Sequence, residues 1–70
     1  MRFDLVFLDP PYAMQDLTEV TGALIPLLAE DALVIVEHEF RTLPVVSGAY
    51  ERTDTRKYGY VGVSFYRIRE

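Results

Sequence analysis

The chain has 70 residues, 50% of them hydrophobic, with no cysteine and a formal net charge of −4 at pH 7. This composition excludes a disordered acidic tail, a disulfide scaffold and a Cys-based zinc site, and no metal site is predicted. A chain of this length makes one small domain at most and buries only about 60–65% of its unfolded surface, so its stability should be marginal unless something else covers it. No apolar run is long enough for a signal-peptide core or a transmembrane span, so we expect a cytoplasmic protein without membrane contacts.

Charge is unevenly distributed along the chain. Residues 1–49 contain two basic and eight acidic residues, a net charge of −6, whereas residues 50–70 contain five basic and three acidic ones, a net charge of +2. A phosphate-facing surface is therefore predicted only in the last third of the chain.

The first predicted element is a buried strand that ends at a carboxylate. Residues 3–8 read Phe-Asp-Leu-Val-Phe-Leu, a run about as long as one interior strand of a parallel sheet. Asp9 follows directly, and in open α/β sheets ligands bind outside the carboxyl ends of the strands. Because Asp and Pro are also common turn residues, a strand that merely ends in a turn is the alternative.

A helix is predicted next. Gln15 or Asp16 can cap it, with Glu19 placed as in a capping box. Pro26 predicts a kink or an early end near Ile25, followed by a short second piece. Apolar residues recur at helical spacing and are expected to pack on the sheet; they are Leu17, Val20, Leu24 and then Leu27 or Leu28.

A second buried strand is predicted over residues 32–37, which read Ala-Leu-Val-Ile-Val-Glu. Strand, helix and strand in this order form a βαβ unit, which places the two strands parallel. Glu37 and His38 then lie on the same rim as Asp9. A histidine at a strand end is more often a hydrogen-bonded rim residue than a ligand or a base, and both roles are open for His38.

Residues 40–48 contain Pro44 and are predicted to form a connecting loop. Two strands over residues 50–55 and 60–68 follow, joined by a turn at residues 56–59 into an antiparallel hairpin. The predicted fold class is therefore α/β, with a βαβ unit followed by a hairpin, about four strands and one main helix.

The segment Asp9-Pro10-Pro11-Tyr12 resembles the signature of enzymes that transfer a methyl group from S-adenosylmethionine to an exocyclic amine of a base. Glu37-His38 after the second strand and Arg56-Lys57-Tyr58-Gly59 before the last strand extend the pattern, which resembles the C-terminal half of the RsmD family. Those enzymes methylate the exocyclic N2 amine of a guanine in small-subunit (16S) ribosomal RNA. The resemblance covers essentially the whole chain and implies a Rossmann-like class I methyltransferase fold.

The motif also has a physical explanation. An exocyclic amine is a poor nucleophile because its lone pair is delocalised into the ring. Two acceptors on its hydrogens, the Asp9 carboxylate and the Pro10 carbonyl, would free that lone pair, and the two prolines stiffen the turn. Tyr12 offers a face on which an extruded base can stack. Asp9, Pro10 and Tyr12 are therefore the predicted catalytic residues.

Substrate-binding residues are predicted around the motif. Pro11, Glu37 and His38 lie on the rim, and Arg56 and Lys57 would contact phosphates of ribosomal RNA or of a pre-assembled small ribosomal subunit. For the two basic residues, a solvated hairpin is an equally good interpretation.

The resemblance implies S-adenosylmethionine as the cofactor. In complete family members, earlier strands carry a glycine-rich turn and an acidic residue for this cofactor. The glycines of this sequence, at positions 22, 48, 59 and 62, are too far apart for such a loop. Residues 1–70 are therefore expected to be a partial methyltransferase domain, the catalytic and base-binding half, in which Asp9 makes at most a marginal cofactor contact.

The resemblance also implies a sheet in which the first two strands are adjacent, followed by the last strand and then the third. The Asp9 strand then has a free apolar edge of the kind that pairs with other chains. We expect self-association or association with an N-terminal half. The alternatives are a fragment of a DNA adenine-N6 methyltransferase and a non-catalytic half-domain that acts only through a partner chain.

Overall fold

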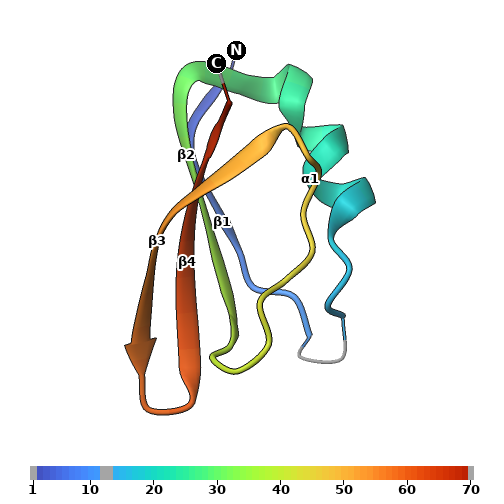
Figure 1. Cartoon of the computed structure of the whole chain (residues 1–70). Coiled ribbons are helices and arrows are strands. Elements are labelled where there is room, and N and C mark those ends of the chain that lie inside the picture. Colours follow the sequence, from blue (N-terminus) through green and yellow to red (C-terminus); the bar gives the residue numbers. More distant parts are fainter. Residues whose placement is uncertain (1, 12–13, 70) are drawn as a thin grey trace.

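A computed structural model describes residues 2–11 and 14–69, which form a four-stranded sheet with a helix packed on one face (Figure 1). The elements are β1 (Phe3–Leu8), α1 (Thr18–Leu24), the 3-10 helix η1 (Ile25–Leu27), β2 (Leu28–Glu39), β3 (Tyr50–Tyr58) and β4 (Val61–Ile68). The strand order is β1-β2-β4-β3, with β1 parallel to β2 and the other two pairs antiparallel. The predicted α/β fold class and the predicted strand order are both confirmed.

The second strand is longer than predicted. It begins at Leu28, which pairs with Phe3 of β1, instead of at residue 32. The early end of the helix near Ile25 is confirmed, because α1 stops at Leu24 and Pro26 lies in η1. Leu28 is already extended, with φ −90° and ψ 139°, so it enters the core from the strand and not from the helix.

The hairpin also differs from the prediction. β3 continues to Tyr58, so Arg56 and Lys57 lie in a strand and not in the turn. Gly59 and Tyr60 make the turn instead. Gly59 has a φ of 64°, in the left-handed region that glycine adopts without strain, and this fixes the turn at that residue.

The start of α1 is tied to the loop between β2 and β3. The cap position is Leu17, and not Gln15 or Asp16 as predicted, because the Leu17 N–H donates to Val45 O at 2.7 Å and Asp16 forms a parallel bridge with Val45. Asp16 still stabilises the first turn. Its Oδ1 accepts from Thr18 N at 3.0 Å and from Thr18 Oγ1 at 2.6 Å.

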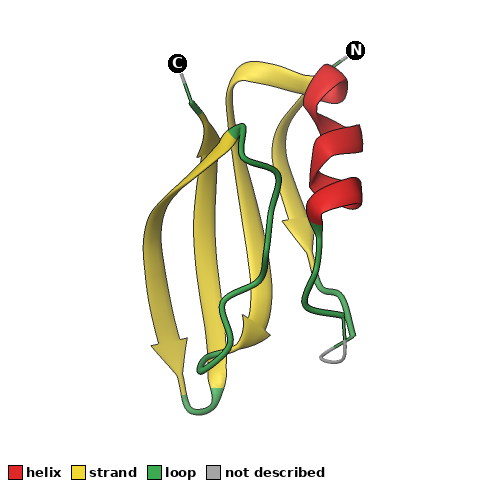
Figure 2. Ribbon diagram, turned by 45° about the vertical axis from the view of Figure 1, so that its right-hand side comes forward, coloured by secondary structure: helices red, strands yellow, loops and turns green. Residues whose placement is uncertain are grey.

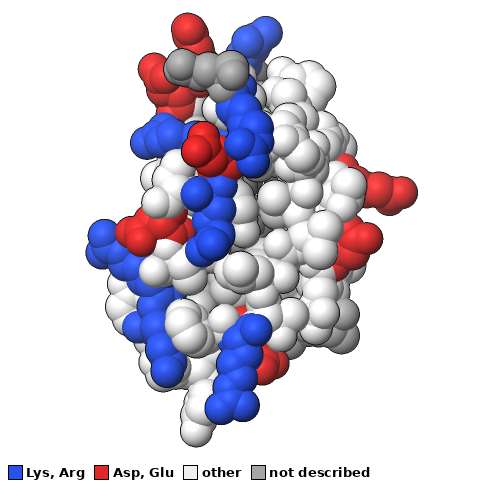
Figure 3. Space-filling view, in the orientation of Figure 1, with Lys and Arg blue, Asp and Glu red and all other residues white. Residues whose placement is uncertain are grey.

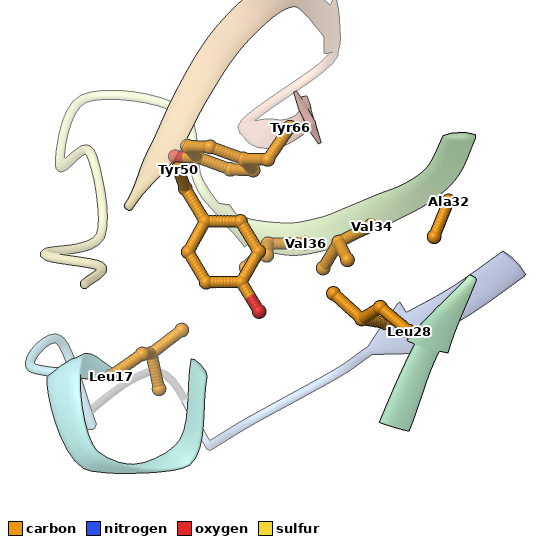
Figure 4. Packing of buried hydrophobic residues seen from close by; sticks show 7 residues of the cluster. All are labelled: Leu17, Leu28, Ala32, Val34, Val36, Tyr50 and Tyr66. Atoms are coloured by element: carbon orange, nitrogen blue, oxygen red, sulfur yellow. The ribbon is translucent and has the colours of Figure 1, made fainter. Parts of the chain in front are cut away.

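One face of the sheet is covered by α1 and by residues 40–49, and this face carries the core (Figure 2). The rings of Tyr50 and Tyr66 meet edge to face, with centroids 6.4 Å apart. The Tyr50 hydroxyl donates to Thr21 O at 2.7 Å, and Thr21 Oγ1 accepts from Ser47 N at 2.9 Å, so strand, helix and loop are held together. The buried core residues are Leu17, Leu28, Ala32, Val34, Val36, Tyr50 and Tyr66 (Figure 4).

The opposite face is also apolar, but no described helix or loop covers it (Figures 1 and 2). Its side chains alternate with those of the core, and the strand register aligns Phe7 with Ile35 and Ile35 with Phe65. We call this surface the open face. Its apolar residues are Phe3, Leu5, Phe7, Leu33, Ile35, Val61, Val63 and Phe65.

Candidate active site at the carboxyl ends of the strands

Three connecting segments meet at the end of the sheet where β1, β2 and β3 finish. They follow Leu8, Glu39 and Tyr58 and lie at the bottom of Figure 1. Leu8 pairs with Val36, so Asp9 and Glu37 follow at the same level of two neighbouring parallel strands. This end is the one at which open α/β sheets bind ligands, and it holds the predicted catalytic motif.

Four of the predicted site residues line one narrow hollow at this end. Pro10 and Pro11 form one side, and Glu37 and His38 form the other. Its free volume is about 10 Å³, about enough for one water molecule. The hollow is therefore too small to enclose a ligand larger than a water molecule. Sequence reasoning missed other lining residues, for which no motif gives a signal; they are Met14, Gln15, Glu39, Thr42 and Pro44.

Asp9 lies on the other side of Pro10. It is exposed and lines a separate hollow of about 220 Å³ that is otherwise mostly apolar. Pro10 and Met14 line both hollows and so form the wall between them. The remaining side chains around Asp9 are Leu8, Leu17 and Val20. The motif thus presents its carboxylate on one side of Pro10 and its prolines on the other. Tyr12, the third predicted catalytic residue, lies outside the described residues.

His38 is buried behind the narrow hollow, with 6% of its surface exposed. Its Nδ1 lies 2.7 Å from Glu39 O and its Nε2 lies 2.7 Å from Ser64 Oγ. A carbonyl oxygen only accepts, so Nδ1 donates to Glu39 O, and in the corresponding neutral tautomer Nε2 accepts from the Ser64 hydroxyl. Both ring nitrogens are engaged. His38 therefore shapes the hollow from behind and presents no free nitrogen to a ligand there.

The hydrogen bonds of His38 continue across the sheet to β3. Thr55 Oγ1 lies 2.9 Å from Ser64 Oγ and accepts from Arg52 Nη1 at 2.7 Å. Gly62 makes room for this arrangement, because a Cβ at that position would lie 2.6 Å from His38 Cε1. The order of donors therefore runs from Arg52 through Thr55 and Ser64 to His38.

The two basic residues predicted to bind substrate lie on opposite faces of the hairpin. Arg56 is on the open face, with its guanidinium carbon 5.8 Å from the centre of the Phe65 ring. Its Nε donates to Asp54 Oδ2 at 3.2 Å, and this contact raises the pKa of Arg56. Lys57 is on the covered face, with Nζ 5.0 Å from the centre of the Phe40 ring. Neither residue lines the narrow hollow.

Basic side chains gather on one side of the molecule. In Figure 3 the Lys and Arg side chains lie mainly over the side that β3 and β4 occupy, while acidic side chains lie both among them and beside α1. Five of the seven basic residues come from positions 50–70, as the uneven charge along the chain predicts.

A family model described as conserved hypothetical protein 95 matches residues 1–67. The chain belongs to this family. Among solved structures, this chain is similar to a conserved hypothetical protein of Streptococcus pyogenes, with 36% identity and a TM-score of 0.80. It is also similar to a protein of Escherichia coli described as a putative methyltransferase, YhhF, with 29% identity and a TM-score of 0.77. The methyltransferase description belongs to the Escherichia coli protein.

The chain spans less than half the length of these two relatives. Each alignment covers 99% of this chain, but only 44% of the Streptococcus pyogenes chain and 41% of the Escherichia coli chain. No curated protein matches the chain. Within residues 2–11 and 14–69, no helix is long and apolar enough to cross a membrane, and no group of three or more His, Asp or Glu side chains is placed to hold a metal ion.

Proposed function

We propose that this chain is the base-binding half of a methyltransferase that transfers a methyl group from S-adenosylmethionine to the N2 amine of a guanine in small-subunit ribosomal RNA. The observation that carries the proposal is the position of Asp9, Pro10 and Pro11, directly after β1 at the ligand-binding end of the sheet, in a chain of this family. The assignment of RNA as the substrate is inferred from the resemblance to the RsmD family. An adenine-N6 methyltransferase acting on DNA would use the same motif.

The chemistry assigned to this chain is the preparation of the amine. With the base across the mouth of the narrow hollow and its amine over Pro10, the wall shared by the two hollows, the Asp9 carboxylate and the Pro10 carbonyl accept from the two amine hydrogens. This draws the nitrogen toward tetrahedral geometry and makes its lone pair available. Asp9 is exposed, so it acts by orienting and polarising the amine, and alignment supplies much of the rate.

The other rim residues hold the base in that position. Glu37 has a carboxylate at the same level of the neighbouring strand, where it can accept from a base N–H. Pro11 gives an apolar wall, and His38 supports that wall from behind. Tyr12 is assigned to stacking on the base from the sequence alone.

S-adenosylmethionine supplies the methyl group when it is bound, and these residues fit it only in part. The hollow beside Asp9 offers one carboxylate and an apolar lining. The sequence contains no glycine-rich turn, and Gly22, Gly48 and Gly59 have open space around the position of a Cβ. We therefore assign most of the cofactor-binding contacts to a partner that contacts the free edge of β1.

The partner surface consists of the free edge of β1 and the open face. Among the strands of residues 2–11 and 14–69, β1 pairs only with β2, so no described strand pairs with its other edge. Phe7 is 56% exposed beside this edge. An N-terminal half-domain of the kind that would fill the remaining length of the relatives is the proposed partner. Self-association through the same edge is the competing outcome.

Two calorimetric titrations test the proposal. The chain alone should give no heat with S-adenosylmethionine, and the chain mixed with the unmatched portion of the Streptococcus pyogenes relative should bind it. The mixture should then transfer labelled methyl groups to a small-subunit RNA fragment and not to an adenine-containing DNA duplex. Preference for the DNA would favour the adenine-N6 alternative. Cofactor binding without transfer to either substrate would favour a non-catalytic half-domain.

Asp9→Asn tests the site assignment in the same mixture. We expect transfer to fall by roughly 100-fold, because one acceptor on the amine becomes a weaker one. Asp4→Asn, five positions earlier and exposed on β1, is the matched control and should leave transfer unchanged. Equal activity of the Asp9 variant and the unchanged chain would remove Asp9 from the site.

A further inference from the structure

A second surface at the same end of the sheet combines cations with aromatic rings. An open hollow of about 470 Å³ lies between the turn that follows β2 and the turn of the hairpin. Its volume is in the range of sites that hold small molecules, about 300–1,000 Å³. The residues that line it are Glu39, Phe40, Arg41, Lys57, Gly59 and Tyr60. We call it the hairpin hollow.

The two walls of the hairpin hollow are joined by a backbone hydrogen bond, from Phe40 N to Tyr60 O at 2.8 Å. Lys57 Nζ lies above the Phe40 ring, 5.0 Å from its centre, and this cation–π contact positions the ammonium beside the hollow that both residues line. Tyr60 is 81% exposed, so its ring is open to a ligand. An exposed aromatic ring beside a fixed cation is the combination that binds a base and its phosphate.

The charge of the hairpin hollow also favours a phosphate. Arg41 and Lys57 oppose a single carboxylate, Glu39, among the lining residues. An acidic peptide would use the two cations but not the exposed ring, whereas a nucleotide uses both.

The hairpin hollow adjoins the narrow hollow of the candidate active site, since Glu39 lines both of them. A polynucleotide with one base at Pro10 and Pro11 would therefore place a neighbouring nucleotide near Tyr60. The covalent link between neighbouring nucleotides is enough to bring the second nucleotide to this surface.

We propose that the hairpin hollow binds a nucleotide that flanks the methylated one in a single-stranded polynucleotide. The flanking base stacks on Tyr60, and its phosphate binds Lys57 and Arg41. This inference rests on the proposed function for the identity of the neighbouring site. Binding in the hairpin hollow itself needs neither cofactor nor methyl transfer.

Fluorescence anisotropy of a labelled seven-nucleotide single strand, as RNA and as DNA, tests the inference with the chain as it is. Tyr60→Ala should weaken binding roughly tenfold, because stacking on one ring is lost. Lys57→Gln and Arg41→Gln should each weaken binding and lower the slope of log K against log salt by about 0.7. All three side chains lie at the surface, and such substitutions leave folding nearly unchanged, which circular dichroism checks. Equal weakening for RNA and DNA indicates recognition of base and phosphate, and a larger effect for RNA indicates contact with the 2′-hydroxyl.

Two matched variants separate the hairpin hollow from general charge and hydrophobicity. Tyr58→Ala removes a ring of the same hairpin that is also exposed but pairs with Val61 on the open face. Arg2→Gln removes a cation at the opposite end of the sheet. Both should bind like the unchanged chain. The inference is overturned if the unchanged chain does not bind, if these controls weaken binding as much as the hairpin-hollow variants, or if polyglutamate displaces the strand as well as unlabelled RNA does.

The outcomes also distinguish this inference from the proposed function. Loss of strand binding in Tyr60→Ala, together with an Asp9→Asn variant that transfers methyl groups normally, would keep the hairpin hollow and discard the methyltransferase site. Normal strand binding in Tyr60→Ala, together with an inactive Asp9→Asn mixture, would do the reverse.

Discussion

The two faces of the sheet are made of similar residues but have different surroundings. On β2, Val34 and Val36 point into the core beneath α1, whereas Leu33 and Ile35 point to the open face and are only half-buried. Parallel strands that are buried on both faces have continuous apolar sequences, and residues 5–8 of β1 and 32–36 of β2 are such runs. The chain therefore has one face that is covered and forms a core. Its other face has the apolar residues of a core but no described element packed on them.

The comparison separates what holds the chain together from what it offers to a partner. On the covered face, Thr21 and Tyr50 connect helix, loop and strand by hydrogen bonds, and the side chains between them are packed. On the open face, no described helix or loop packs on the apolar residues. Contiguous exposed apolar surface of this kind marks an interaction site.

The largest expected effect comes from shortening a side chain of the covered face. Leu17 is 1% exposed, and Leu17→Ala should lower the free energy of unfolding by about 2–5 kcal/mol, which is much of the stability of a small domain. Leu5→Ala, at a position 61% exposed on the open face, should cost far less. Urea unfolding followed by circular dichroism measures both. Equal losses would show that the two faces are equally covered in solution.

A second effect concerns the hydrogen-bonded polar residues of the covered face. Ser64→Ala removes the hydroxyl between His38 and Thr55 and leaves a buried acceptor unpaired, at a cost of about 1–3 kcal/mol. Nitrogen chemical shifts of His38 report the tautomer directly. The unchanged chain should show a proton on Nδ1 and none on Nε2, and the variant should shift the Nε2 resonance. A proton on Nε2 of the neutral ring would contradict the donor order described above.

The third prediction tests the open face as an association surface. A positive charge on an edge strand opposes pairing with another chain, so Phe7→Lys should weaken self-association at least tenfold in sedimentation velocity. Leu43→Lys makes the same change at an exposed loop residue away from the open face, and should have little effect. A monodisperse monomer at every concentration would refute self-association, and equal effects of both variants would indicate charge alone.

Local patterns predicted the elements of this fold well because each one follows from a few residues. Pro26 ends the helix, and the apolar runs identify β1 and β2. The bounds that were wrong depend on contacts between distant residues. Leu28 belongs to β2 because it pairs with Phe3. Leu17 is the cap residue because its N–H donates to Val45 O. Neither partner is visible from local sequence.

The site was predictable as a set of residues but not as a geometry. Placing Pro10, Pro11, Glu37 and His38 on one rim follows from parallel strands. That both nitrogens of His38 are engaged depends on Ser64, 26 positions away, and on the absence of a side chain at Gly62. The hairpin hollow depends on the turn at Gly59, because the predicted turn at residues 56–59 would have removed Lys57 from a strand.

The smallest expected effect concerns the stability of the helix that covers the core. The size of this effect depends on pH. The hydrogen bonds from the Thr18 side chain and backbone lower the pKa of Asp16 below its ordinary value of 3.8. A lowered pKa in the folded state means that the carboxylate stabilises the fold at pH values above 3.8, and that this contribution is lost as the pH falls through the folded-state pKa. The melting temperature of Asp16→Ala should therefore be a few degrees below that of the unchanged chain at pH 6. This difference in melting temperature, the gap, should become smaller toward pH 2.5. Because Asp16 is fully exposed, the gap should be small beside the Leu17 effect, and a gap that stays constant with pH would show that the charge of Asp16 does not hold the start of α1.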